Sequence, residues 1–340
     1  MYKLGILDQS PVFPGASAID ALKETIELAQ QAEKWGYSRF WVSEHHHSEE
    51  VAGSSPEVLI SYLLAHTNSI RIGSGGVMLQ HYSPYKVAEN FNLLANLAPG
   101  RVDLGIGKAP GGLPLSTKAL QYGSSNNGID FDERLSLLKK ITENSVGDDH
   151  ELAGIQATPI PAEGPEMFLL GASPNSAKLA ADLGIGFVFA LFFNSDKTIL
   201  EEAAKVYWSN YPNGRFSVAV HVLAAPTKEE AEQLAGDQKI IKVHLQSGRS
   251  VTVTTLENAR KFGIQSGEPY EIKEQEANII AGTPQYVKET LTKLHQDYQV
   301  DEFILHTSLL KKEERLRSFQ LLSPLHSQDK LIEERKEQHA

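Results

Sequence analysis

The chain has 340 residues, 41% of them hydrophobic, so it can bury a large core and is not a disordered protein. Its 43 acidic and 32 basic residues give a formal net charge of −11, which argues against broad binding to nucleic acids or anionic membranes. The absence of cysteine excludes disulfides, thiolate metal sites and cysteine nucleophiles.

Short β-rich runs alternate with longer amphipathic patterns along the chain. Eight runs have the composition of strands, at 2–8, 38–44, 70–79, 101–107, 167–172, 186–192, 215–225 and 301–309. Helical patterns lie between most of them, at 18–36, 55–67, 84–98, about 130–144 and 282–294. Alternation of this kind predicts a parallel sheet, and eight strands favour closure into a (β/α)8 TIM barrel. A doubly wound open sheet is the alternative.

The domain organisation follows from the same pattern. We expect one barrel domain over residues 1–325, because no linker or internal repeat interrupts the alternation. Residues 247–280 are polar and weakly periodic, which indicates an insertion between the seventh strand and its helix. Residues 326–340 have the composition of a charged, solvated tail. The opening residues turn polar too soon for a signal peptide and no long apolar span follows, so we expect a cytoplasmic protein.

Four unusual segments follow predicted strands. They are SEHHH after the second strand, GGVMLQHYSP at the third, GIGKAPGG at the fourth and GASPNS at the fifth. In a barrel, active sites are built at the carboxyl ends of the strands. The four segments would therefore converge on one rim, where Phe13, Tyr82, Phe192 and Phe193 are compatible with an apolar pocket.

The histidine run His45–His47 has three possible interpretations: metal ligands, a proton-handling site, or ordinary surface. In an extended strand end, His45 and His47 would point the same way, as in metal-dependent barrel hydrolases. Such sites need further ligands from the first and last strands. Only Asp8 and Glu44 could contribute oxygens here, so the set is incomplete and we expect no metal.

Two further segments suggest a bound anion or a close backbone approach. Glycines at 73, 75 and 76 weaken a strand unless the backbone adopts unusual dihedrals, approaches another group or forms a bulge. Ser173 is a good helix N-cap followed by Pro174, a helix start that either holds phosphate or is simply capped. Lys108 could pair with such an anion or be an ordinary exposed lysine. Neither the dinucleotide nor the P-loop glycine motif is present.

These segments, taken in order, resemble the luciferase-like flavin monooxygenases. WVSEHH is similar to the family's W-x-x-E-H-H motif, and RIGSGGVMLQHYSPYKVAENFNLLANLAPGRVDLGIGKAPGG is similar to its longest shared block. GASPNSAKLAADLG is similar to its phosphate segment and AGTPQYV to its late helix start. The likeness covers residues 1–325, and its start, LGILDQSP, is that of a non-luminescent branch.

The resemblance implies a TIM barrel, with FMN as cofactor and reduced FMN as co-substrate of a two-component monooxygenase. By position, His45 would handle protons around a flavin hydroperoxide, with Glu44 and His46 as supporting neighbours. The pair Gly75 and Gly76 would form a cis peptide against the flavin ring. The resemblance places the flavin phosphate at four residues, Lys108, Ala172, Ser173 and Ser176.

Two positions depart from the family pattern. Gly107 stands where the luciferases have an active-site cysteine, and Lys108 stands where they have an arginine. Lysine cannot bind phosphate in the two-pronged manner of arginine, so FMN retention would be weaker.

Partners follow from the same resemblance. Reduced FMN would come from a separate reductase, because the chain has no nicotinamide motif. The helices at 55–67 and 84–98 carry apolar stripes that would form a homodimer. The alternatives are a deazaflavin-dependent hydride-transfer enzyme, a flavin-binding protein without turnover, and a metal hydrolase; the organic substrate is not defined by the sequence.

Overall fold

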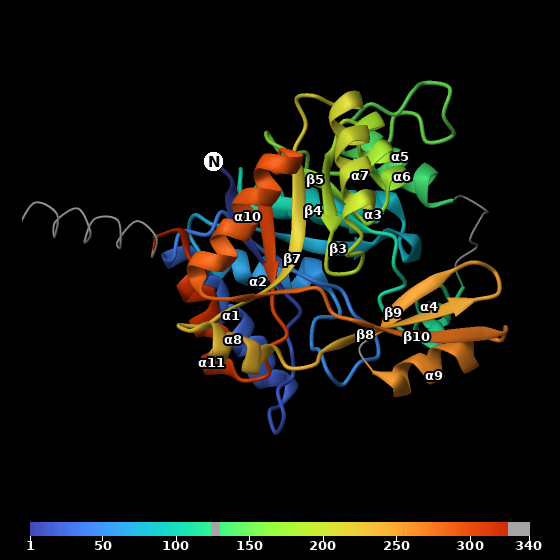
Figure 1. The fold of residues 1–340 in the computed structure, drawn as a ribbon. Helices are drawn as coiled ribbons and strands as arrows, with labels where there is room; N and C mark the ends of the chain where they lie inside the picture. The colour runs from blue at the N-terminus through green and yellow to red at the C-terminus, as the bar shows by residue number, and fades with distance from the viewer. Residues whose placement is uncertain (124–129, 254, 326–340) are drawn as a thin grey trace, which may run out of the picture.

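The computed structural model describes residues 1–123, 130–253 and 255–325. The predicted tail, 326–340, lies outside the described residues, as does part of the loop that follows the fourth strand. All eight predicted strands are present and close into a TIM barrel (Figure 1). In barrel order they are β1 (Lys3–Asp8), β2 (Arg39–Val42), β3 (Arg71–Met78), β4 (Val102–Gly107), β5 (Glu166–Gly171), β6 (Gly186–Ala190), β7 (Phe216–Ala224) and β12 (Glu302–His306). Every neighbouring pair is parallel, and β12 returns to β1.

Helices surround the barrel, as the alternating pattern predicts (Figure 1). The longer ones are α1 (Ala18–Lys34), α2 (Pro56–His66), α3 (Pro84–Leu97), α5 (Phe131–Thr142), α6 (Pro174–Asp182), α7 (Lys197–Asn210), α10 (Pro284–Tyr298) and α11 (Lys312–Leu322). Short helices are η1 (Leu79–His81), α4 (Pro114–Leu120) and α8 (Lys228–Ala235). Their starts are fixed locally, for example by the Ser17–Asp20 capping box of α1. Among the described residues, no helix is long and apolar enough to cross a membrane.

The segment between β7 and α10 is more ordered than its polar composition suggests. It contains β8 (Lys239–Leu245), β9 (Ser250–Val253), α9 (Leu256–Ser266) and β10 (Tyr270–Glu276), and the three strands form an antiparallel sheet beside α4 (Figure 1). One face of this sheet packs on Ala259 and Phe262 of α9. The other face is solvated, and this one-sided burial explains the weak apolar signal. A last strand, β11 (Ile279–Gly282), returns the chain to the barrel beside β7.

The barrel interior is layered. Alternate residues of a strand point to one side, so the register identifies side chains that lie at the same depth. Near the amino ends, Arg39 bonds Asp103 at 2.8 Å and lies 2.9 Å from Glu302. Two residues further along the strands, an apolar layer fills the barrel with Leu7, Trp41, Phe168, Val188, Ala219 and Ile304. The next positions along the strands form the floor of the carboxyl-end mouth.

Candidate active site

Glu44 is the centre of a buried hydrogen-bond cluster just beyond β2. Its Oε2 accepts the backbone N–H of Met78 at 2.9 Å. Its Oε1 accepts the Tyr82 hydroxyl at 2.8 Å and lies 2.7 Å from Nε2 of His46. The carboxylate is 1% exposed, so these contacts replace the water that it loses on folding. Glu44 therefore ties the end of β2 to the end of β3 and orients His46.

His45 lies at the same rim, with Nδ1 3.0 Å from the Ser43 hydroxyl and its backbone N–H bonded to Gly53. Burial, helped by neighbouring His46, lowers the pKa of His45 to about 4. A free imidazole titrates near pH 6.5. In the folded chain His45 is neutral near pH 7, because the surrounding protein disfavours its charged form. A neutral imidazole can still donate one proton or accept another.

His47 differs from its two neighbours. Its side chain is exposed, and its backbone φ is +53°, so the chain is not extended here. The arrangement in which His45 and His47 point the same way requires an extended strand end, and it does not form. In the part of the chain that the structure describes, no group of three or more His, Cys, Asp or Glu side chains is placed to hold a metal ion.

The glycine-rich part of β3 is irregular in the way that its composition indicates. The Gly75–Gly76 peptide is cis, and the pairing of β3 with β4 shifts register between Ser74 and Val77. A Cβ at Gly76 would lie 2.7 Å from the Gly105 carbonyl oxygen. Glycine is thus required by the close approach of the two strands.

The start of α6 has the predicted cap. The Ser173 hydroxyl accepts the Ser176 N–H at 3.3 Å and lies 3.1 Å from the Ser176 hydroxyl. The amides of Ser173 and Asn175 have no intrahelical partners because they lie in the first turn, where no helical carbonyl precedes them by four residues, and Pro174 has no N–H. Ala172 precedes this turn, and its carbonyl accepts Asn194 Nδ2 at 3.1 Å.

Lys108 follows β4, the neighbour of β5, but its contacts go elsewhere. Its Nζ lies 3.7 Å from Asp132 and 5.2 Å from the ring centre of Phe131, both on α5. The lysine is 67% exposed, so this ion pair is weak. Lys108 is therefore near the expected rim without being bonded to the start of α6.

The sequence patterns did not reveal three residues at this rim, nor the polar role of a fourth. His81 is buried, with Nε2 2.9 Å from the Pro110 carbonyl. Tyr82, considered only as an aromatic, donates to Glu44. His221 lies on β7 and His306 ends β12. Their register with Ala219 and Ile304, rather than any motif, reveals that they face the barrel interior.

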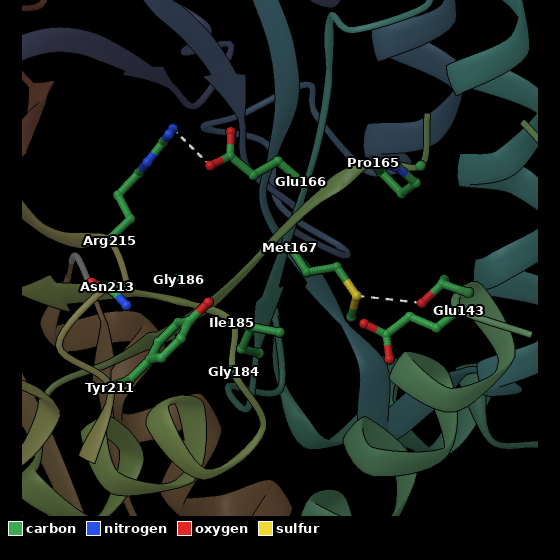
Figure 2. A pocket seen from close by; sticks show the side chains of 13 residues that line it. Glu143, Pro165, Glu166, Met167, Gly184, Ile185, Gly186, Tyr211, Asn213 and Arg215 are labelled. Carbon is green, nitrogen blue, oxygen red and sulfur yellow. Dashed lines mark hydrogen bonds and ion pairs between the residues drawn. The ribbon is translucent and has the colours of Figure 1, made fainter. Parts of the chain in front are cut away.

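A separate cavity of about 410 Å³ lies at the amino ends of β5, β6 and β7, away from the histidines (Figure 2). Arg215 and Glu166 pair across its wall at 2.6 Å, and Tyr211 and Met167 also line it. Active sites of barrels are built at the opposite, carboxyl end. We therefore assign the chemistry to the histidine rim and not to this cavity.

Comparison with known proteins gives a consistent answer. The sequence model described as "Luciferase-like monooxygenase" matches residues 2–301. The chain belongs to the luciferase-like monooxygenase family. A relative from Bacillus subtilis, N-acetyl-S-alkylcysteine monooxygenase, is 48% identical over 326 residues, which cover 95% of this chain and 98% of the relative. This membership of the luciferase-like monooxygenases makes the chain an enzyme of the monooxygenase type, as the sequence predicts.

Solved structures support the fold. Apo-MsnO8 superposes with a TM-score of 0.75 at 32% identity, covering 95% of this chain and 96% of MsnO8. The oxygenating constituent of 3,6-diketocamphane monooxygenase from Pseudomonas putida, solved with FMN, has a TM-score of 0.68 at 20% identity over 95% of this chain and 97% of its own. At that identity the second comparison shows the luciferase-like barrel alone.

Proposed function

We propose that this chain is an FMN-dependent, two-component monooxygenase that oxygenates a small organic substrate. Reduced FMN would reach it from a separate flavin reductase. The observation that carries the proposal is the position of His45, on the rim of a luciferase-like barrel and beside the Glu44–His46 pair at 2.7 Å. The segments that follow β3, β4 and β5 end on the same rim.

The described residues fit a flavin at this place. The amides of Ser173 and Asn175 and the hydroxyl of Ser176 suit a phosphate at a helix N-terminus. Glycine at 75 and 76 leaves the strand surface without side chains, which suits the packing of a flat ring. Lys108 is 67% exposed and only weakly paired with Asp132, so its positive charge is available to a phosphate.

Bound reduced FMN would supply the two electrons and the activation of oxygen. The chain's own part is to exclude water and to handle protons. His45 is neutral near pH 7, so it can hydrogen-bond a reacting oxygen without a fixed charge. Glu44 keeps His46 in place and closes the space between β2 and β3.

For the substrate, we propose thioethers related to N-acetyl-S-alkylcysteine, because the relative of that name is 48% identical along almost the whole chain. One oxygen atom of O2 would enter the thioether and the other would leave as water. Reduced FMN would be oxidised to FMN in the same turnover, which balances the electrons.

Titration with oxidised and photoreduced FMN, followed by turnover with a flavin reductase, tests this proposal. We expect flavin binding, and product from N-acetyl-S-benzylcysteine only when reduced FMN is supplied. His45→Asn should lower the product rate by about 10²-fold or more, the usual contribution of a general acid or base, with little change in FMN affinity. Flavin binding without product from a thioether panel would favour a flavin carrier, and hydride transfer to a deazaflavin would favour a dehydrogenase.

A further inference from the structure

A second pair of histidines faces the barrel mouth, outside the His45 cluster. His221 on β7 and His306 on β12 are register partners, and their ring centres are 5.2 Å apart. Each lies two residues beyond a side chain of the apolar layer, Ala219 and Ile304 respectively. Because alternate residues of a strand share a face, both imidazoles point into the barrel at its carboxyl end.

The hydrogen bonds of His221 define its tautomer. Its Nε2 accepts the backbone N–H of Ser308 at 3.2 Å and lies 2.9 Å from the Ser308 hydroxyl. That hydroxyl donates to Oε1 of Gln238 at 2.6 Å. The proton of a neutral His221 therefore sits on Nδ1, which has no hydrogen-bond partner among the described residues. The Nδ1–H donor of His221 is therefore left without a partner in the described part of the chain, although the residue is only 8% exposed.

Both imidazoles of the pair are uncharged near neutral pH. Burial lowers the pKa of His221 to about 4, and burial, with the neighbouring His221, Arg315 and His45, lowers the pKa of His306 well below its ordinary value of 6.5, so both imidazoles are neutral near pH 7. The carboxylate on the adjoining strand, Asp8, is already bonded by Arg315 at 2.7 Å and by the Ser10 N–H. A carboxylate in the mouth would therefore meet the Nδ1–H donor of His221, and the charge of the neighbouring Asp8 is balanced by Arg315.

An apolar wall lies beside the pair. The ring centre of Phe192, which follows β6, is 5.6 Å from that of His306 and 4.3 Å from that of Phe193. A ligand held here would thus contact the imidazole donor of His221 on one side and an aromatic surface on another. This combination suits a small organic acid better than an inorganic ion.

We propose that His221 and His306 bind a carboxylate group of the substrate. This inference rests on the proposed function, since it assigns one end of the same substrate, and it makes organic acids the preferred class. His45 is close enough to lower the pKa of His306, so it lies within the same mouth. The carboxylate would position the reacting atom, and the histidine pair would act as specificity-determining residues rather than as proton carriers.

Binding of two probes that differ by one charge tests the proposal. N-acetyl-S-benzylcysteine and its primary carboxamide are titrated into the flavin-free and the FMN-loaded protein by calorimetry. We expect the acid to bind at least about tenfold more tightly than the amide, or about 1.4 kcal/mol. His221→Gln, which keeps an acceptor for the Ser308 N–H but removes the Nδ1 donor, should abolish most of this preference.

Two further variants complete the design. His306→Phe keeps a ring against Phe192 and should also lose the preference. His47→Asn, an exposed histidine at a left-handed position that asparagine accepts, should retain it. Thermal unfolding of each variant separates loss of the ligand site from loss of the fold.

Equal binding of acid and amide by the unaltered protein, or binding of neither, would overturn the carboxylate site. The FMN titration reports separately on the proposed function. If the protein binds the acid more tightly than the amide but does not bind FMN, the proposed flavin enzyme is refuted and the carboxylate site is supported. If the protein binds FMN and oxygenates both probes but binds them equally, the flavin enzyme is supported and the carboxylate site is refuted.

Discussion

At the scale of single residues, Glu44 is the side chain on which the site depends most. It accepts from a backbone amide and a tyrosine and contacts His46, all while buried. Glu44→Ala would leave the buried Met78 N–H and the partly buried Tyr82 hydroxyl without partners, at a cost of about 1–3 kcal/mol each. We expect the free energy of unfolding to fall by about 3 kcal/mol.

Urea unfolding measures this effect, and Glu49→Ala is a matched control on the same loop because Glu49 is exposed. Tyr82→Phe removes one of the donors and should cost about 1 kcal/mol. If Glu44→Ala were as stable as Glu49→Ala, the hydrogen-bond cluster would not hold β2 to β3.

The buried histidines predict a pH dependence of stability. His45 and His221 have pKa values of about 4 in the folded chain, against about 6.5 for a free imidazole. Between these values the unfolded chain binds more protons than the folded one, so stability falls as the pH is lowered from about 6.5 towards 4.

The loss of stability from pH 7 to pH 5 should be smaller in His221→Gln than in the unaltered protein by about 1–2 kcal/mol. Urea unfolding at the two pH values measures the difference. His47→Asn should show the same loss as the unaltered protein, because His47 is exposed. An equal loss in His221→Gln would mean that His221 is not held neutral.

At the scale of elements, the contact between β3 and β4 sets the shape of the rim. A Cβ at Gly105 would lie 2.1 Å from the Ser74 carbonyl oxygen, and backbone cannot move aside as a flexible side chain can. Gly105→Ala should therefore destabilise the fold by about 3 kcal/mol, the upper part of the range for overpacking.

Gly164→Ala is the control, because no atom lies within 4 Å of a Cβ built there. Thermal and urea unfolding of the two variants give the comparison. Similar stabilities for both would show that β3 and β4 have room to separate, and the close approach at Gly76 would lose its explanation.

At the scale of the whole molecule, the neighbouring helices α2 and α3 present an apolar surface. Val58 and Tyr62 are 67% and 54% exposed on α2, and Leu93 and Leu97 are 49% and 65% exposed on α3. Each pair has the i, i+4 spacing of one helix face. A patch of this kind marks an interaction site, and we expect it to form a homodimer.

Sedimentation of the unaltered protein should therefore show a dimer, and Leu97→Glu should shift it to monomer. Ile264→Glu changes an equally exposed residue on α9 and should leave the dimer intact. A monomer before any substitution would contradict this expectation.

Sequence patterns predicted the eight barrel strands and several of the helices around them, because apolar periodicity and helix caps are local signals. The same patterns predicted that His45, Gly75–Gly76 and Ser173 lie on one rim, because the carboxyl ends of parallel strands share an edge. His221 and His306 could not be found this way, because their neighbourhood depends on register across β7 and β12. The lowered pKa of His45 was also out of reach, since burial is a property of the folded chain.

The central claim, that this barrel oxygenates a small acid with reduced FMN, is tested most directly with isotopic oxygen. The chain is supplied with a flavin reductase, FMN, N-acetyl-S-benzylcysteine and 18O2, and the product is analysed by mass spectrometry. Our account predicts one 18O atom in the product, only when reduced FMN is present, with little label in His45→Asn. Consumption of reduced FMN with hydrogen peroxide as the sole oxygen product, and no labelled thioether, would contradict it.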